Sequence, residues 1–248
     1  MSTINFTQVA KTYGDVRALD RVDFTVREGE FVALLGPSGC GKSTLLNLVA
    51  GFEKLSEGTM SFDGRPVTKP GPDRGVVFQE AALLPWLSVW ENVVFGPKVQ
   101  RISRAEYEPR ATDILRIVGL ENFHAALPVQ LSGGMRQRVG IARAFVMQPR
   151  ALLMDEPFGA LDAQTRLSMQ ALLLDVWQSL KTTVLFVTHD IDEAILLADR
   201  VCVMTARPGR ITRDIPITLP RPRTLDALTS AEFTRFKAEI MAEMRGVH

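Results

Sequence analysis

Residues 36–44 have the types and the spacing of a phosphate-binding loop. They match the pattern G-x-x-x-x-G-K-[ST] at every fixed position. Glycines let backbone N–H groups approach phosphate oxygens closely, and in this pattern Lys42 reaches the β- and γ-phosphates while the Ser43 hydroxyl binds Mg²⁺. The predicted nucleotide contacts from this loop are Gly36, Ser38, Gly39, Cys40, Gly41, Lys42, Ser43 and Thr44. The pattern therefore predicts a site for a nucleotide with Mg²⁺.

A second group of polar residues follows apolar runs elsewhere in the chain. Gln79 ends one run, and Asp155 and Glu156 end another. His189 comes just after a third. Asp155 is suited to hold the magnesium, and Glu156 to orient and deprotonate an attacking water. Gln79 offers an amide to the metal and the water, and His189 can donate to the γ-phosphate. Together with Lys42, these side chains predict hydrolysis of the bound nucleotide.

The elements that position these residues are four apolar runs of strand length. They are residues 31–35, 75–78, 151–154 and 183–187. Continuous apolar runs are typical of parallel strands that are buried on both faces. The carboxyl ends of parallel strands meet at one edge of the sheet, where ligands bind. A helix-forming run, 45–50, follows the phosphate loop and would direct its positive end toward the phosphates.

Residues 131–134, Leu-Ser-Gly-Gly, form a second glycine-rich stretch before a helical pattern. One interpretation makes Ser132 a helix N-cap and the glycines a loop. The other makes Ser132, Gly133 and Gly134 a second anion site at a helix start. One nucleotide needs only one phosphate loop, and this stretch has no lysine of its own. A second anion site is therefore expected to close over the nucleotide of another copy of the chain.

Composition limits the possible partners. The chain has 248 residues, 29 basic and 28 acidic, so its net charge of +1 gives no footprint for nucleic acid. No apolar run is long enough to span a membrane, and the start of the chain lacks the layout of a signal peptide, so the chain is expected neither to span a membrane nor to be exported. Cys40 and Cys202 have no metal-ligand spacing and are expected to be ordinary thiols.

Other segments are less distinctive. Residues 4–9 and 22–26 are expected to be short strands, with Tyr13 in an exposed turn between them as a platform for a base. A hairpin is expected over 57–64, and a helix over 103–118 that ends at Gly119. Residues 224–245 are also expected to be helical, as a regulatory tail or a dimer contact.

The segment from 80 to 130 has a different composition and is expected to be an inserted helical subdomain. Its Trp86 and Trp90 are candidates either for the core or for a surface that binds a partner. The residues themselves leave these two interpretations open.

In this order, the motifs resemble the ATP-binding subunits of ATP-binding cassette (ABC) transporters over nearly the whole chain. The motifs are the aromatic Tyr13, the loop 36–44, Gln79, the signature 131–134, Asp155 with Glu156, the loop 159–162 and His189. The resemblance implies an α/β P-loop NTPase of the ABC type. Such a fold has a mostly parallel central sheet, an N-terminal antiparallel β-subdomain and an inserted helical subdomain. The expected boundaries are 1–79 and 131–218 for the ATPase core, 80–130 for the inserted subdomain and 219–248 for a C-terminal tail.

The same resemblance implies a head-to-tail homodimer that binds two ATP molecules with Mg²⁺. Each ATP would lie between the loop 36–44 of one copy and Ser132, Gly133 and Gly134 of the other. Tyr13 would stack on adenine, and Asp162 would help to link the two sites. Residues 80–95 would receive a helix of a membrane permease, which favours a partner surface for the tryptophans. Met135 occupies the place of the family's usual glutamine, so any polar contact of that side chain is lost.

A finer resemblance is to the nitrate, sulfonate and taurine importer branch, most of all to taurine-importer ATPases. It depends on residues 71–79, 83–86, 158–166, 208–210 and 219–223. It implies an ATPase bound to permease subunits at the cytoplasmic face of the cell membrane, with a solute-binding protein as an indirect partner. The alternatives are a soluble ABC-type ATPase of DNA repair or translation, and a non-hydrolysing regulatory cassette. The first usually has fused cassettes or basic tracts, and the second lacks catalytic residues that are all present here.

Overall fold

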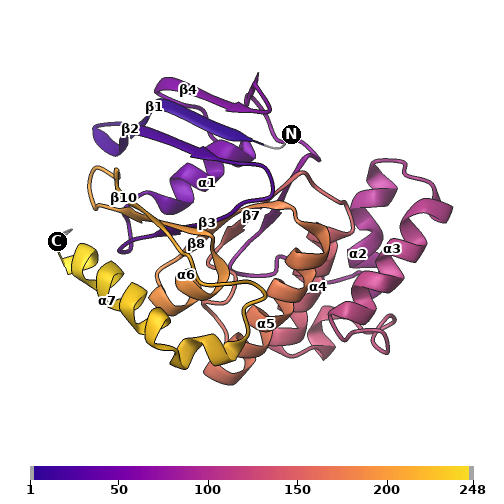
Figure 1. Cartoon of the computed structure of the whole chain (residues 1–248). Helices are drawn as coiled ribbons and strands as arrows, with labels where there is room; N and C mark the ends of the chain where they lie inside the picture. Colours follow the sequence, from indigo (N-terminus) through magenta and orange to yellow (C-terminus); the bar gives the residue numbers. More distant parts are fainter. Residues whose placement is uncertain (1–2, 246–248) are drawn as a thin grey trace.

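The computed structural model describes residues 3–245. The predicted ATPase core includes residues 1–2, and the predicted C-terminal tail includes residues 246–248. Both stretches lie outside the described residues. The chain forms a four-stranded sheet, a six-stranded sheet and helices that cover both faces of the larger one (Figure 1). The predicted fold class is confirmed, since an antiparallel sheet near the N-terminus accompanies a mostly parallel central sheet.

The four-stranded sheet has the strand order β2-β1-β4-β5 and is antiparallel throughout. Its strands are β1 (Ile4–Tyr13), β2 (Val16–Val26), β4 (Glu57–Phe62) and β5 (Arg65–Pro66). The first two strands are longer than predicted. Because Thr12 pairs with Arg17 and Tyr13 with Val16, Tyr13 ends a strand rather than lying in a turn. The predicted hairpin over 57–64 is confirmed by β4 and β5.

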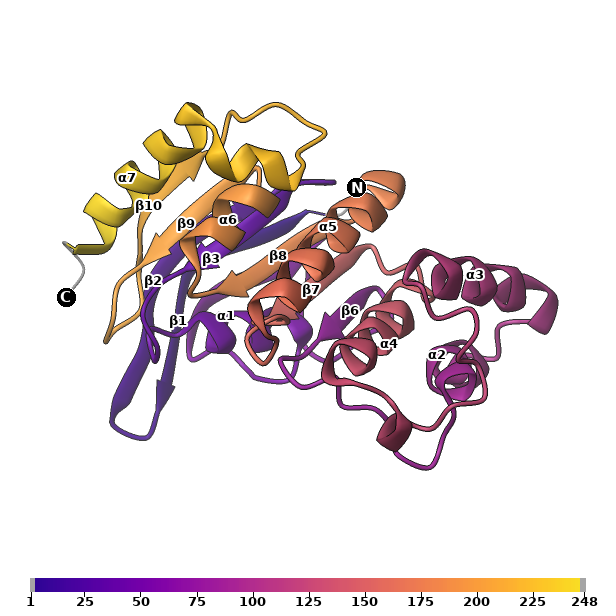
Figure 2. The ribbon, with the colours of Figure 1, turned by 90° about the horizontal axis from the view of Figure 1, so that it is seen from below.

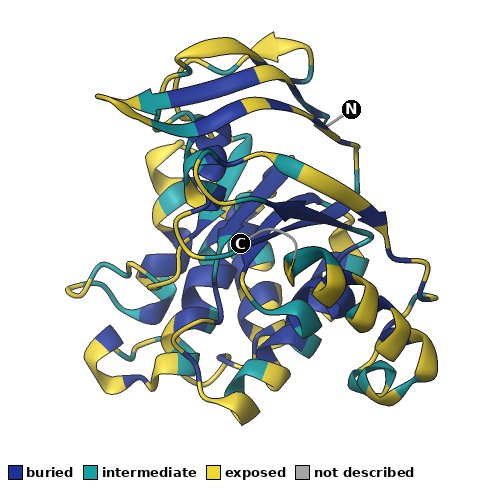
Figure 3. Ribbon diagram, turned by 90° about the vertical axis from the view of Figure 1, so that its left-hand side faces the viewer, coloured by how far each residue is buried: buried dark blue, intermediate teal, exposed yellow. Residues whose placement is uncertain are grey.

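The six-stranded sheet has the order β10-β9-β3-β8-β7-β6. Its strands are β3 (Phe31–Leu35), β6 (Arg74–Val77), β7 (Ala151–Asp155), β8 (Thr183–Thr188), β9 (Arg200–Met204) and β10 (Ile211–Pro216). The four predicted apolar strands pair in parallel, and only β10 pairs antiparallel at the edge. Figure 3 shows the centre of this sheet as buried.

Alternate residues of the central strands face two different cores. On one face, Leu34 and Leu185 pack with α1 (Lys42–Ala50) and the antiparallel sheet, so α1 lies between the two sheets. On the other face, Phe31 and Phe186 pack with the remaining helices. The helices on that face are α4 (Gly133–Phe145), α5 (Ala163–Leu180), α6 (Ile191–Leu197) and α7 (Ala231–Arg245).

Helices α2 (Val89–Val99) and α3 (Arg104–Ile117) lie with α4 at the end of the molecule opposite α7 (Figure 2). The predicted helix over 103–118 is confirmed as α3. The short 3-10 helix Pro128–Gln130 leads into α4. The tryptophans differ: Trp86 is 71% exposed, but Trp90 packs against the core and stacks on His124 at 5.2 Å between ring centroids. Trp86 is therefore accessible to a partner, Trp90 contributes to the core, and the predicted partner surface stays a prediction.

Residues 224–245 are helical as predicted, as a 3-10 helix at Leu225–Thr229 followed by α7. Phe233, Phe236 and Ile240 of α7 are buried in the core on the α5 and α6 side of the sheet. The two cysteines are buried free thiols, as predicted, and burial raises the pKa of each. The predicted domain boundaries stay predictions.

Candidate functional site

The predicted phosphate loop joins the carboxyl end of β3 to the start of α1. Gly41 precedes the helix with a φ of 96°, in the left-handed region that favours glycine. A Cβ on Gly41 would lie 2.6 Å from Leu19 Cδ2 and 3.0 Å from the Ala18 carbonyl oxygen. Strand β2 thus packs directly beneath the loop, and only glycine fits at this position.

Lys42 is buried, with its ammonium group held inside the loop. Its Nζ donates to the Gly36 carbonyl at 2.8 Å and to the Pro37 carbonyl at 3.0 Å. The same Nζ lies 4.0 Å from Glu156 Oε1. A positive charge is therefore fixed between the loop backbone and the acidic end of β7.

Ser43 and Asp155 are brought together from α1 and β7, as the sequence predicts for two ligands of one metal. Ser43 Oγ donates to Asp155 Oδ1 at 3.0 Å. Burial raises the pKa of the Asp155 carboxyl and the Glu156 charge raises it further, while the Ser43 hydrogen bond and the Lys42 charge lower it. A hydroxyl and a carboxylate are oxygen donors that suit Mg²⁺. Among residues 3–245, no group of three or more His, Cys, Asp or Glu side chains is arranged to hold a metal ion.

Glu156 and His189 form a pair at the ends of β7 and β8. His189 Nδ1 lies 2.9 Å from Glu156 Oε2. This is hydrogen-bond distance, at which a carboxylate oxygen can accept from a ring N–H. The Glu156 carboxylate is therefore placed between an ammonium group and an imidazole, beside the Ser43–Asp155 pair.

Gln79 follows β6 at the same edge of the sheet. Its side chain is exposed, and a Cβ on Gly159 would lie 3.1 Å from Gln79 Nε2. It lines a pocket of about 470 Å³ between residues 79–83, the start of α4 and residues 160–161. This structure therefore places Gln79 beside the signature segment and the loop 159–162.

The signature residues begin α4. Ser132 is the N-cap, and its Oγ accepts a hydrogen bond from Met135 N at 3.2 Å. Gly134 faces α5, where a Cβ on it would lie 2.6 Å from Thr165 Cγ2. Gly133 lines the pocket beside Gln79, and none of the residues that line this pocket comes from the loop 36–44. Both interpretations of the stretch are compatible with this geometry, since the N-cap leaves backbone N–H groups at the helix start.

Tyr13 and Asp162 lie at the ends of their elements. The Tyr13 side chain is 42% exposed, and Lys11 Nζ lies 4.5 Å from its ring centroid. Lys11 is itself paired with Glu53 at 2.8 Å, which holds its ammonium group over the Tyr13 ring.

Asp162 caps α5 by accepting from Thr165 N at 3.0 Å, and hydrogen bonds with Thr165 lower the pKa of its carboxyl.

Sequence reasoning missed the residues that hold these groups in place. Buried Glu193 of α6 accepts from Thr188 Oγ1 at 2.7 Å and from Gln170 Nε2 at 3.1 Å. Gln137 Nε2 donates to the Phe78 carbonyl at 3.2 Å, and Arg143 donates to the carbonyls of residues 81 and 82. The only sequence signal for these residues is the occurrence of a polar side chain on the inner face of an amphipathic helix.

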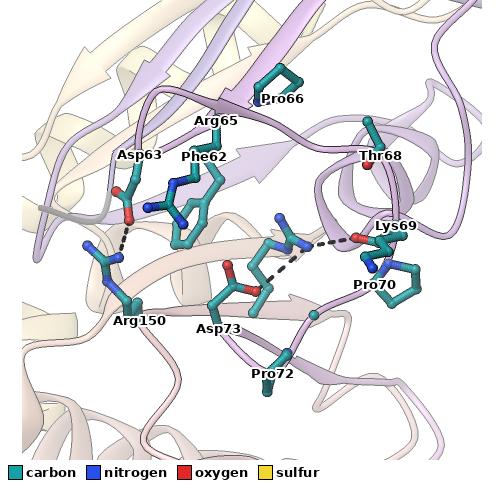
Figure 4. Close-up of a pocket in the computed structure, with 12 residues that line it drawn as sticks. Phe62, Asp63, Arg65, Pro66, Thr68, Lys69, Pro70, Pro72, Asp73 and Arg150 are labelled. Atoms are coloured by element: carbon teal, nitrogen blue, oxygen red, sulfur yellow. Dashed lines mark hydrogen bonds and ion pairs between the residues drawn. The ribbon is translucent and has the colours of Figure 1, made fainter.

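A separate pocket of about 590 Å³ lies below β4 and β5 (Figure 4). Arg74 and Arg150, which line it, stand at the start of β6 and just before β7, so the pocket is at the amino end of these strands, away from the predicted site. Arg150 pairs with Asp63 at 2.5 Å, and Arg74 Nη2 donates to the Lys69 carbonyl at 2.8 Å. None of the predicted site residues lines it.

Across residues 3–245, no helix is long and apolar enough to cross a membrane. Helix α7, for example, buries only Phe233, Phe236 and Ile240.

Comparison with known proteins identifies the family. The family model described as "ABC transporter" matches residues 19–159. A taurine import ATP-binding protein of Rhizobium johnstonii is 51% identical, covering 96% of this chain and 92% of its own length. A nitrate import ATP-binding protein of Synechocystis is 47% identical, covering 94% and 90%. A solved dimeric ATP-binding cassette with ADP and Pi has a TM-score of 0.75 at 34% identity, covering 88% of this chain and all of that one.

The matched region begins in β2 and ends just after Glu156, so it includes the phosphate loop, Gln79, the signature and the acidic end of β7. The relatives extend the similarity to nearly the full chain. The chain is an ATP-binding protein of the ABC transporter family.

Proposed function

We propose that the chain is the ATP-hydrolysing subunit of an ABC importer for taurine, aliphatic sulfonates or nitrate. The observation that carries the hydrolytic role is the position of the Glu156 carboxylate between Lys42 Nζ and His189 Nδ1, next to the Ser43–Asp155 pair. Such a carboxylate can accept a proton from water while positive and hydrogen-bonding groups surround the phosphate.

Water held by Glu156 attacks the γ-phosphate in line with the leaving oxygen. Lys42 turns from the loop carbonyls toward the β- and γ-phosphates and offsets their charge. Ser43, Asp155 and Gln79 would hold Mg²⁺, which would supply positive charge to neutralise the phosphates. His189 donates a ring N–H to the γ-phosphate.

The site is completed by a second copy. Ser132, Gly133 and Gly134 of that copy bind the phosphates through the Ser132 hydroxyl and the backbone N–H groups at the start of α4. Tyr13 stacks on adenine, and Asp162 links the two sites. The similarity to a dimeric cassette with ADP and Pi supports this arrangement. ATP binding is then an assembly step that can move a permease.

The transported solute is proposed from the relatives, which carry the names of taurine and nitrate importers. The chain would sit on permease subunits at the cytoplasmic face of the membrane, through residues 80–95, and respond indirectly to a solute-binding protein. Reconstitution with the permease and the binding protein tests this: taurine, an alkanesulfonate or nitrate should stimulate ATP turnover. If ATP turnover with each of the three solutes is the same as turnover without any solute, the proposed solute class is contradicted.

The hydrolytic role is tested by Glu156→Gln. We expect turnover to fall by about 10²–10⁴-fold, because an amide cannot accept the proton from water. ATP binding should remain, since the phosphate loop is untouched. The exposed Glu121→Gln is the matched control and should leave turnover unchanged. Near-normal hydrolysis by the Glu156 variant would remove this residue as the base.

The competing proposal, an ABC-type ATPase of DNA repair or translation, is distinguished by its partners. The net charge of +1 does not favour nucleic acid. Membrane fractionation separates the two: an importer subunit should co-purify with membrane proteins, and a chain that never does so would favour the alternative.

A further inference from the structure

We propose that the C-terminal segment, residues 219–245, holds helix α6 at both ends and thereby positions His189. This rests on the proposed function, in which His189 contacts the γ-phosphate. It gives the segment a part in catalysis by positioning, with no contact of its own to the nucleotide.

The C-terminal end of α6 is held by Arg223. This guanidinium group is buried and donates to the carbonyls of Ile195 at 3.0 Å and Ala198 at 2.6 Å. The last carbonyls of a helix lack partners within the helix, and a cation there is favoured by the helix dipole. Arg223 also donates to the Ile217 carbonyl at 3.0 Å, which ties the helix end to the strand connection. One side chain therefore fixes where α6 ends.

The neighbouring Arg221 strengthens this anchor. Its guanidinium carbon lies 4.2 Å from the Trp177 ring centroid of α5, and its Nη2 donates to the Leu197 carbonyl at 2.7 Å. It also pairs with Asp199 at 2.7 Å. Segment 219–223 thus bonds the last turn of α6 from two positions and fixes it against α5.

The N-terminal end of α6 is held by Lys237 of α7, whose Nζ donates to Asp192 at 2.8 Å. Asp192 lies in the first turn of α6. Helix α7 is fixed in turn by its buried Phe233, Phe236 and Ile240. The C-terminal helix therefore holds the same end of α6 that follows His189.

The first turn of α6 fixes both neighbours of His189. Asp190 caps the helix by accepting from Asp192 N at 2.8 Å and Glu193 N at 3.1 Å. Thr188 Oγ1 donates to Glu193 at 2.7 Å and accepts from Asp190 N at 3.0 Å. A displacement of α6 would therefore move residues 188 and 190 together, and with them the His189 ring that contacts Glu156.

A competing explanation is that α7 only covers apolar surface and stabilises the fold. The Lys237–Asp192 pair distinguishes the two, because it is partly exposed and can be changed without opening the core. A matched control lies on the same helix: Glu243 pairs with Arg213 of β10 at 3.1 Å and makes that contact away from α6.

The experiment measures kcat, KM for ATP and melting temperature in the full-length chain for Lys237→Glu, Asp192→Lys and the double exchange. We expect each single reversal to lower kcat several-fold with KM for ATP unchanged, since Tyr13 and the phosphate loop are untouched. The double exchange should restore kcat, and Glu243→Lys should leave it unchanged. An equal loss in the control, or unchanged kcat in the single reversals, would overturn the proposal.

A second set separates positioning from stability. On a His189→Ala background, Lys237→Glu should reduce the residual turnover no further, because the side chain that it positions is gone. An additive loss would contradict positioning. Arg223→Lys keeps the positive charge but loses the several N–H donors of the guanidinium group, so it should lower kcat more than Lys237→Glu does. If the Arg223 variant fails to fold, the Lys237 and Asp192 variants decide the question alone. Unchanged turnover in His189→Ala itself would instead contradict the proposed role of His189.

Discussion

Glu156 has a left-handed backbone, with a φ of 44°, which is unusual for a side chain other than glycine. Its N–H donates to the Val187 carbonyl at 2.9 Å, and its own carbonyl accepts from Gly159 N at 3.0 Å. These bonds hold the conformation, whose cost is about 1–3 kcal/mol for a residue in such a region. The turn directs the carboxylate toward Lys42 and His189, so local strain accompanies the proposed catalytic position.

At the residue scale, Gly134→Ala should destabilise the protein by about 1–3 kcal/mol, because its Cβ would lie 2.6 Å from Thr165 Cγ2 and overpack the contact between α4 and α5. Gly133→Ala is the control, since its Cβ would lie 4.0 Å from the Arg136 guanidinium. Thr165→Ser removes the methyl group and should recover stability in the double variant. Urea unfolding measures the free energy of unfolding of the parent, the two alanine variants and the double variant. Equal stability of the two alanine variants would refute the contact.

Tyr13 gives a second prediction at this scale. Tyr13→Ala should raise KM for ATP about tenfold with kcat unchanged, because base stacking on an aromatic ring is worth about 1–3 kcal/mol. Tyr13→Phe keeps the ring and should behave as the parent chain. Steady-state kinetics with ATP test both, and an unchanged KM in the alanine variant would exclude a stacking role.

At the scale of elements, β8, α5 and α6 share one buried carboxyl group. Burial raises the pKa of Glu193 above its ordinary value of 4.5, while the hydrogen bonds from Thr188 and Gln170 act in the opposite direction. The folded protein therefore keeps this proton over a pH range that begins near the ordinary pKa and extends past the raised pKa. In that window the folded state binds more protons than the unfolded state.

This difference predicts that the free energy of unfolding falls as pH rises through the window. Glu193→Gln cannot titrate, so its stability should depend less on pH there. Urea unfolding of both chains across mildly acidic to neutral pH isolates the contribution of this one group. Glu121→Gln, on the surface, should keep the parent's pH dependence. Parallel curves for the parent and the Glu193 variant would argue against a raised pKa.

At the scale of the whole molecule, the pocket beside the signature contains no residue of the phosphate loop. The proposed dimer would explain why one chain carries two predicted anion-binding segments at different places. Each nucleotide would use one segment from each copy, so neither copy holds a complete site alone.

Mixing two defective chains tests this composite site. Lys42→Ala removes the loop charge, and Ser132→Arg blocks the signature. Each variant alone should hydrolyse ATP very slowly, because both of its sites carry a defect. A mixed dimer has one site with both defects and one with none, so turnover should reappear on mixing. Mixing Lys42→Ala with Glu156→Gln is the control, because both defects lie in the same half of the site and each site of the mixed dimer keeps one. No recovery in the first mixture would contradict head-to-tail sharing.

The sequence by itself determined the central strands and predicted which residues carry the chemistry. The loop 36–44, Asp155, Glu156 and His189 could be predicted because phosphate and metal chemistry demand fixed residue types, and because strands buried on both faces have continuous apolar runs. The same logic predicted that their ends meet at one edge of the sheet. The sequence predicts Tyr13 in a turn, but Tyr13 ends a strand. The end of a strand depends on pairing with a partner segment, which the local sequence does not specify.

Only the tertiary structure decided which side chains contact one another. Trp86 is exposed and Trp90 is packed, although both lie in one short segment, because burial depends on what folds against each ring. The Glu156–His189 contact joins residues 33 positions apart, and Arg223 bonds carbonyls 25 and 28 positions away. Such contacts depend on how helices pack on the sheet, and spacing along the chain does not fix that packing. The sequence thus predicted candidate reacting groups, and only the tertiary structure shows the contacts of α6 and α7 that we propose hold His189 in place.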